Sequence, residues 1–95
     1  LTEDELKQIV DLMLNDTQKV LDDRNIKMFV SDEAKQFILE KGTDIKFGAR
    51  PLRRTIEKYI EDELSEMILK GNLKNGQNIY IDLVENKLNF KAKKS

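Results

Sequence analysis

Apolar residues recur every three or four positions between Leu52 and Ile68, and this spacing predicts one long amphipathic helix. The members of this apolar stripe are Leu52, Ile56, Tyr59, Ile60, Leu64, Met67 and Ile68. Pro51 suits the first turn, because a proline lacks the backbone N–H that would be unpaired there, and Gly71 is placed to end the helix. A helix with one apolar face needs a second layer to cover that face.

A second amphipathic helix is predicted at the start of the chain. Thr2 and Glu5 match a capping box, in which each side chain can satisfy a backbone N–H of the other residue. The helix that follows is predicted to end near Asp22. Its apolar stripe, with Thr17 as a polar interruption, consists of Leu6, Ile9, Val10, Met13, Val20 and Leu21.

A third helix, short strands and turns account for the other residues. Ser31 and Gly42 are predicted to cap a short helix between them. Asn75–Gly76 and residues 85–87 are predicted turns, and residues 93–95 a frayed tail. Apolar and polar residues alternate, as they do in strands, in residues 26–30, 79–84 and 88–92.

The predicted order of elements is α-β-α-α-β-β, which indicates an α+β fold. Because each helix has an apolar face to bury, we expect two layers, with the helices packed on a small sheet of about three strands. We expect residues 1–95 to form a single domain, since a chain of this length can bury about two-thirds of its unfolded surface in one core. The sequence begins with a leucine and enters a helix at once, so we expect a fragment of a larger protein, with a processed N-terminus as the alternative.

The composition excludes several kinds of chemistry. The chain has no cysteine and no histidine, so disulfides, the usual zinc sites and histidine acid–base catalysis are all excluded. Charged residues make up 37% of the chain, yet the net charge is only -1, so no overall field favours nucleic acid or an anionic membrane. No apolar run approaches the roughly 20 residues that span a bilayer. Adjacent acids at 22–23 and 61–63 point in different directions around a helix, so we expect no metal site.

The most unusual segment is Gly48–Arg54, where arginines gather at the start of the long helix. Arg50 lies at the junction of loop and helix, and Arg53 and Arg54 follow within the first turn. Arginines there oppose the helix dipole, which favours acids in the first turn, so a compensating anion is needed. Backbone N–H groups at a helix start and a guanidinium together suit a phosphate. The segment therefore predicts a phosphate-binding site.

Other interpretations of these arginines stay open. They could pair with acids such as Glu57 or Asp62, or be solvated. An interaction domain could also oligomerise through its helices without any role for nucleotide. A nucleic-acid-binding module would bind in a salt-sensitive way. Its basic residues would be Lys46, Arg50, Arg53, Arg54 and Lys58.

The same segment carries a resemblance to the Clp-type AAA+ unfoldases ClpA, ClpB and ClpC. Their sensor-two motif is similar to the Gly-Ala-Arg-Pro-Leu-Arg-Arg sequence of residues 48–54. The resemblance continues through residues 31–42, 43–47 and 56–66, and so covers essentially the whole chain. It implies the C-terminal small subdomain, or lid, of the second AAA+ module of such a protein.

The resemblance also implies a role for single residues. Arg50 would be the sensor-two arginine, which reaches the γ-phosphate of ATP held by a separate large subdomain. Gly48 and Ala49 would lie near the adenosine with their backbone, and Mg²⁺ would be supplied by the large subdomain. The chain has no G-x-x-x-x-G-K-[ST] phosphate loop, so by itself we expect it to bind ATP or ADP only as one wall of a site and not to be an enzyme.

The implied partners lie in a ring-forming parent protein. They are the large AAA+ subdomain of the same chain and neighbouring protomers of a hexameric ring, which an exposed face with Arg53, Glu57 and Glu61 would contact. A ClpP-like peptidase could dock on regions outside this chain. We expect no nucleic-acid and no membrane partner, and a location in the cytoplasm of a bacterium or the matrix of a plastid or mitochondrion.

Overall fold

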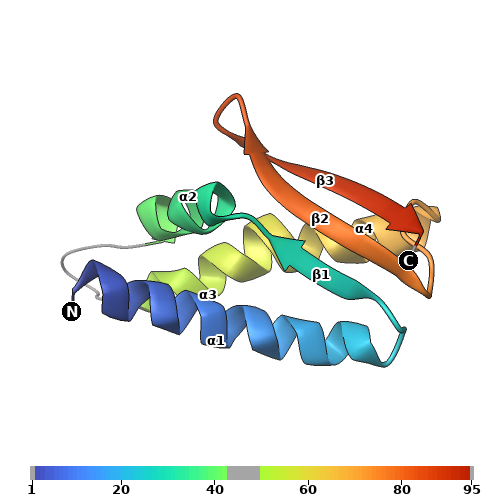
Figure 1. Ribbon diagram of the computed structural model, residues 1–95, viewed down its shortest axis with the longest axis horizontal. Coiled ribbons are helices and arrows are strands. Elements are labelled where there is room, and N and C mark those ends of the chain that lie inside the picture. Colours follow the sequence, from blue (N-terminus) through green and yellow to red (C-terminus); the bar gives the residue numbers. More distant parts are fainter. Residues whose placement is uncertain (1, 43–49, 95) are drawn as a thin grey trace.

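The computed structural model describes residues 2–42 and 50–94, apart from the side chains of residues 50 and 51. The order of elements confirms the predicted α-β-α-α-β-β arrangement, and Figure 1 shows the helices gathered on one side of the sheet. The helices are α1 (Glu3–Asp22), α2 (Asp32–Gly42), α3 (Arg50–Ile56) and α4 (Asp62–Lys70). The strands are β1 (Lys27–Val30), β2 (Gln77–Val84) and β3 (Lys87–Lys94).

The long predicted helix contains a π-helical turn. This turn, η1 (Glu57–Glu61), joins α3 to α4, and at its end the N–H of Asp62 donates to the carbonyl of Glu57. Such turns widen a helix locally and redirect the side chains next to them. Gly71 ends α4 in the left-handed conformation with φ of 80°, as the sequence predicts.

The three strands form one mixed sheet in the order β1-β2-β3. β1 runs parallel to β2, and β2 runs antiparallel to β3. The β2–β3 hairpin turns through Glu85 and Asn86, which both have positive φ, as a two-residue hairpin turn requires. This tight turn keeps the strands in register as far as Gln77 opposite Lys94. The prediction of a frayed tail was therefore wrong for Lys93 and Lys94, which belong to β3.

The core lies between the helices and the inner face of the sheet. In β2, Ile79 and Ile81 are buried, whereas Tyr80 between them is exposed on the other face. The other buried apolar residues are Val10, Leu14, Leu21, Ile26, Ala34, Ile38, Leu39, Leu52, Ile56, Ile60, Leu64 and Leu73. Four helices and the central strand thus share one core, which confirms the two-layer α+β prediction.

Side-chain caps fix the ends of the N-terminal elements. Thr2 accepts a hydrogen bond from the N–H of Glu5 at 3.2 Å, and Ser31 accepts one from the N–H of Ala34 at 3.1 Å, as predicted. The amide of Gln18 donates to the carbonyl of Ile26 and accepts from the N–H of Met28. It therefore occupies the free edge of β1 as a neighbouring strand would. No helix among the described residues is long and apolar enough to cross a membrane.

Candidate functional site

The predicted phosphate-sensing residue lies at the beginning of α3. Arg50 is the first residue of that helix, as the sequence predicts. Gly48 and Ala49, predicted to lie against the adenosine, are outside the described residues, and so is Lys46. The part of the site that the structure does describe is the framework that holds the start of α3.

A close approach of two helices anchors the start of α3. A Cβ atom at Gly42, the last residue of α2, would lie 2.8 Å from Leu52 Cδ2 and 3.0 Å from Leu52 Cα. It would also lie 2.8 Å from Thr55 Oγ1. Leu52 is fully buried, two positions after Arg50. Gly42 thus does more than end its helix, because only a glycine lets α3 pack this closely.

The two arginines after Arg50 differ in their partners. Arg53 pairs with Asp16 of α1 at 3.7 Å, with both side chains more than half exposed, so the pair contributes at most about 1 kcal/mol. Arg54 is exposed and has no ion pair within the part of the chain that the structure describes. Neither arginine pairs with Glu57 or Asp62, but Arg53 does pair with an acid and Arg54 is exposed, so the alternative that the arginines pair with acids or are solvated holds for these two. The ion pair of Arg53 joins α3 to α1 instead.

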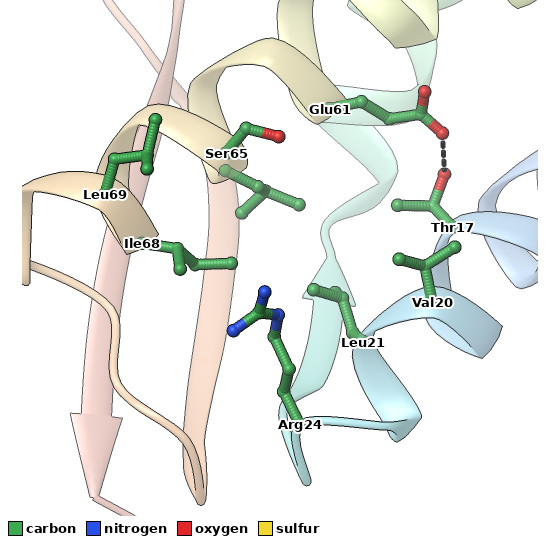
Figure 2. A pocket seen from close by; sticks show the side chains of 9 residues that line it. Thr17, Val20, Leu21, Arg24, Glu61, Ser65, Ile68 and Leu69 are labelled. Atoms are coloured by element: carbon green, nitrogen blue, oxygen red, sulfur yellow. Dashed lines mark hydrogen bonds between the residues drawn. The ribbon is translucent and has the colours of Figure 1, made fainter.

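The π-helical turn brings Glu61 to α1. Thr17 Oγ1 donates a hydrogen bond to Glu61 Oε1 at 2.9 Å (Figure 2). Thr17 itself is only 4% exposed. Glu61 was predicted to lie on a face toward a neighbouring subunit, which stays a prediction, and its carboxylate also has a partner inside the domain. A sign of this bond was present in the sequence, where Thr17 interrupts an apolar stripe and needs a partner once buried.

A groove of about 450 Å³ runs between α1 and α4 beside this hydrogen bond. It is lined by Thr17, Val20, Leu21, Arg24, Glu61, Leu64, Ser65, Ile68 and Leu69. Val20 was predicted to lie in the buried stripe of α1, yet it is 66% exposed, and Leu69 is 86% exposed. Figure 2 shows the guanidinium of Arg24 pointing into the groove between Leu21 and Ile68. An apolar groove with a cation inside it suits an apolar segment that also carries an acid.

Chemistry based on a metal has no support in the described part of the chain. Residues 2–42 and 50–94 contain no group of three His, Cys, Asp or Glu side chains that could hold a metal ion. In the described residues, the framework of the candidate site has three parts. They are the start of α3, which carries Arg50, the tight contact between α2 and α3 behind it, and the open groove beside α4.

Comparison with known proteins places the chain in a family. The family model described as the C-terminal, D2-small domain of ClpB protein matches residues 1–81. The chain belongs to this family. It is thus a C-terminal small domain of the Clp-family AAA+ proteins. The D2-small match includes residues 48–54, and all of α1 to α4.

Similar curated proteins carry Clp names. The ClpC ATP-binding subunit of the ATP-dependent Clp protease of Staphylococcus epidermidis is 50% identical over 82 residues, which are 86% of this chain and 10% of ClpC. The corresponding ClpC of Staphylococcus aureus is 49% identical over 82 residues, with the same shares of both chains. The chaperone protein ClpB of Aquifex aeolicus is 41% identical over 90 residues, which are 95% of this D2-small domain and 9% of ClpB. The chain therefore spans about a tenth of these relatives.

Proposed function

We propose that this D2-small domain is the ATP-sensing lid of a ring-forming AAA+ protein unfoldase. Arg50 reaches from the start of α3 to the γ-phosphate of ATP in a site on the large subdomain of the same chain. The observation that carries this proposal is that Arg50, in a sequence that resembles the sensor-two motif, begins a helix within a matched Clp family domain.

The chemistry of phosphoryl transfer fits an arginine in this role. Catalysis depends on positioning and on stabilising charge on the phosphate oxygens, which a guanidinium does through paired N–H donors. Gly48 and Ala49 contribute backbone contacts near the adenosine, and Mg²⁺ is held by the large subdomain. The isolated chain does not hydrolyse ATP, because its sequence has no phosphate-binding loop.

The tight contact between α2 and α3 supports the role of a rigid lid. Because Gly42 packs directly on Leu52 and Thr55, movement of the domain moves the start of α3 with it. A lid of this kind couples the state of the nucleotide to the orientation of the whole small domain. In the parent protein this motion pulls on a polypeptide substrate.

The groove between α1 and α4 supports contact with other parts of a hexameric ring. Val20 and Leu69 are exposed apolar side chains on its two sides, and Arg24 lies between them. A neighbouring protomer that covers the groove would bury both. We place the parent in the bacterial cytoplasm, since the relatives described above are bacterial, with an organelle matrix as the alternative. A ClpP-like peptidase docks, if the parent is of the ClpC type, on regions outside this domain.

ATP turnover of the full-length parent tests the role of Arg50. Arg50→Ala is expected to lower turnover by about 100-fold or more while the ring stays assembled, because one preorganised charge donor is removed. Arg54→Ala is the matched control, since Arg54 lies in the same helix and is exposed. Unchanged turnover in Arg50→Ala would remove Arg50 from the mechanism. Equal losses in both variants would indicate a general effect of positive charge.

A further inference from the structure

The outer face of the sheet, turned away from the helices, combines aromatic and basic side chains. Alternation along the strands and the register between them place one set of residues on this face. The set, here called the basic sheet face, consists of Lys27, Phe29, Asn78, Tyr80, Asp82, Val84, Lys87, Asn89, Lys91 and Lys93. Nothing in the described chain covers Phe29, Tyr80 or Val84, which are 46%, 36% and 50% exposed.

Two aromatic rings stand at the centre of the basic sheet face. Phe29 and Tyr80 are paired across β1 and β2, and their rings are stacked with centroids 5.0 Å apart and an angle of 14° between the planes. Lys93 of β3 approaches the Tyr80 ring from the other neighbouring strand, with Nζ 5.4 Å from the centroid. Tyr80 thus has a ring on one side and a cation on the other.

The charge of this face is opposite to that of the chain. Four lysines and one aspartate leave it with three net positive charges, whereas the whole chain carries -1. Acids gather elsewhere, for example in the first turn of α1 at Glu3, Asp4 and Glu5. Lysines border the ring pair in two directions, since Lys27 precedes Phe29 by two residues in β1 and Lys91 lies opposite Tyr80 in β3.

We propose that the basic sheet face binds an acidic polypeptide segment of another protein. An apolar side chain of that segment packs on the Phe29–Tyr80 pair, and carboxylates on either side of it reach the lysines of β1 and β3. Charge complementarity of this kind gives specificity and fast association. The proposal goes beyond nucleotide sensing and holds whether or not Arg50 contacts ATP.

Two simpler accounts explain less of this face. Lysines on the edge strand β3 protect an exposed edge from pairing with other chains, but this does not explain an exposed aromatic pair at the centre of the sheet. Single-stranded nucleic acid stacks its bases on free aromatic faces. Tyr80 offers no such face, because Phe29 and Lys93 flank it on the two neighbouring strands. A polypeptide is therefore the occupant that the geometry favours.

Titration of the isotope-labelled 95-residue chain with a defined peptide, followed by NMR, tests this proposal. The peptide carries one leucine with glutamates on both sides, and the control peptide has lysines in place of the glutamates. We expect saturable shifts at Phe29, Tyr80 and Lys91 with the acidic peptide alone. Lys91→Glu should weaken binding by about tenfold, because one attractive contact becomes repulsive. The same charge reversal at the exposed Lys7 of α1 should change the affinity for the acidic peptide by less than about twofold.

Each other outcome of this experiment contradicts the proposal. An equal loss of affinity in Lys91→Glu and Lys7→Glu would mean that the attraction is non-specific. If the acidic peptide causes no shifts even at the highest concentration used, the face has no such site. Tighter binding of oligothymidylate at the same residues would assign the face to nucleic acid. Concentration-dependent broadening of the same signals without peptide would assign it to a second copy of the chain. If Lys91→Glu does not fold, Lys91→Gln and Tyr80→Thr provide the same comparison.

Discussion

The contact between α2 and α3 and the groove between α1 and α4 represent two kinds of helix packing in one small domain. At the first, Gly42, Leu52 and Thr55 are all buried, and there is no room for one more carbon atom. At the second, Val20 and Leu69 are exposed around a groove of about 450 Å³. The first contact is complete within the chain, whereas the second leaves apolar side chains exposed, and we propose that another part of the parent protein covers them.

This difference separates what the domain needs for folding from what it offers to partners. Substitutions at the tight contact should reduce the free energy of unfolding of the isolated chain. Those at the exposed groove residues Val20 and Leu69 should leave that stability almost unchanged and act only in the assembled parent. The start of α3, where Arg50 lies, belongs to the tight contact.

The largest expected effect is at Leu52. Leu52→Ala should lower the free energy of unfolding of the chain by about 2 to 5 kcal/mol, because it leaves a cavity at a fully buried position. The matched change in the groove, Leu69→Ala, should cost less than about 0.5 kcal/mol, since that side chain is 86% exposed. Urea unfolding followed by circular dichroism measures both. Similar losses in the two variants would abolish the distinction between the contacts.

A smaller loss is expected from a single added methyl group. Gly42→Ala gains up to about 1 kcal/mol of helix propensity but overpacks the contact by about 1 to 3 kcal/mol. Because the new Cβ would meet the backbone at Leu52 Cα, we expect a net destabilisation of about 1 to 2 kcal/mol. Glu40→Ala, at an exposed position of α2, is the control and should be close to neutral. A more stable Gly42→Ala variant in thermal unfolding would refute the close approach.

The hydrogen bond beside the groove should have a smaller effect still. Thr17→Val keeps the shape of the side chain but removes the donor to Glu61, and should cost about 1 kcal/mol. Thr17→Ser keeps the hydroxyl and should retain the contribution of the bond, apart from one lost methyl group. Unfolding of the double variant Thr17→Val/Glu61→Ala, together with the two single variants, isolates the coupling between the two residues. Additive effects would mean that this bond does not tie η1 to α1.

Much of the architecture was predictable from local signals. The caps at Thr2 and Ser31 and the alternation in β2 each indicate one element that the structure has. The apolar spacing of residues 52–68 predicts helix throughout, and the structure has helix there, divided by η1 into α3 and α4. The effect of the hairpin turn on strand length was harder to predict from its residue types. Glu85 and Asn86 both adopt positive φ and form a tight turn. The strands after this turn stay paired as far as Lys94, although the composition of the last residues indicates a tail.

Features that depend on contacts between distant elements were not predictable. The bond from Thr17 to Glu61 and the tight approach at Gly42 join residues of different helices, and the π-helical turn interrupts a helix whose apolar spacing predicts no interruption. Periodicity reports which side of a helix is apolar, but not how closely another helix approaches it. The candidate site stays a prediction, which rests on the conflict between a cluster of arginines at a helix start and the helix dipole.

The most direct test of the account is a double-mutant cycle for ATP turnover in the full-length parent, at a temperature where all variants stay folded. If the tight contact acts by positioning Arg50, Gly42→Ala should lower turnover by about tenfold in the wild-type background. It should add almost nothing once Arg50→Ala is present, because the group that it positions is gone. An equal proportional loss in both backgrounds would contradict the account and would separate the helix contact from nucleotide sensing.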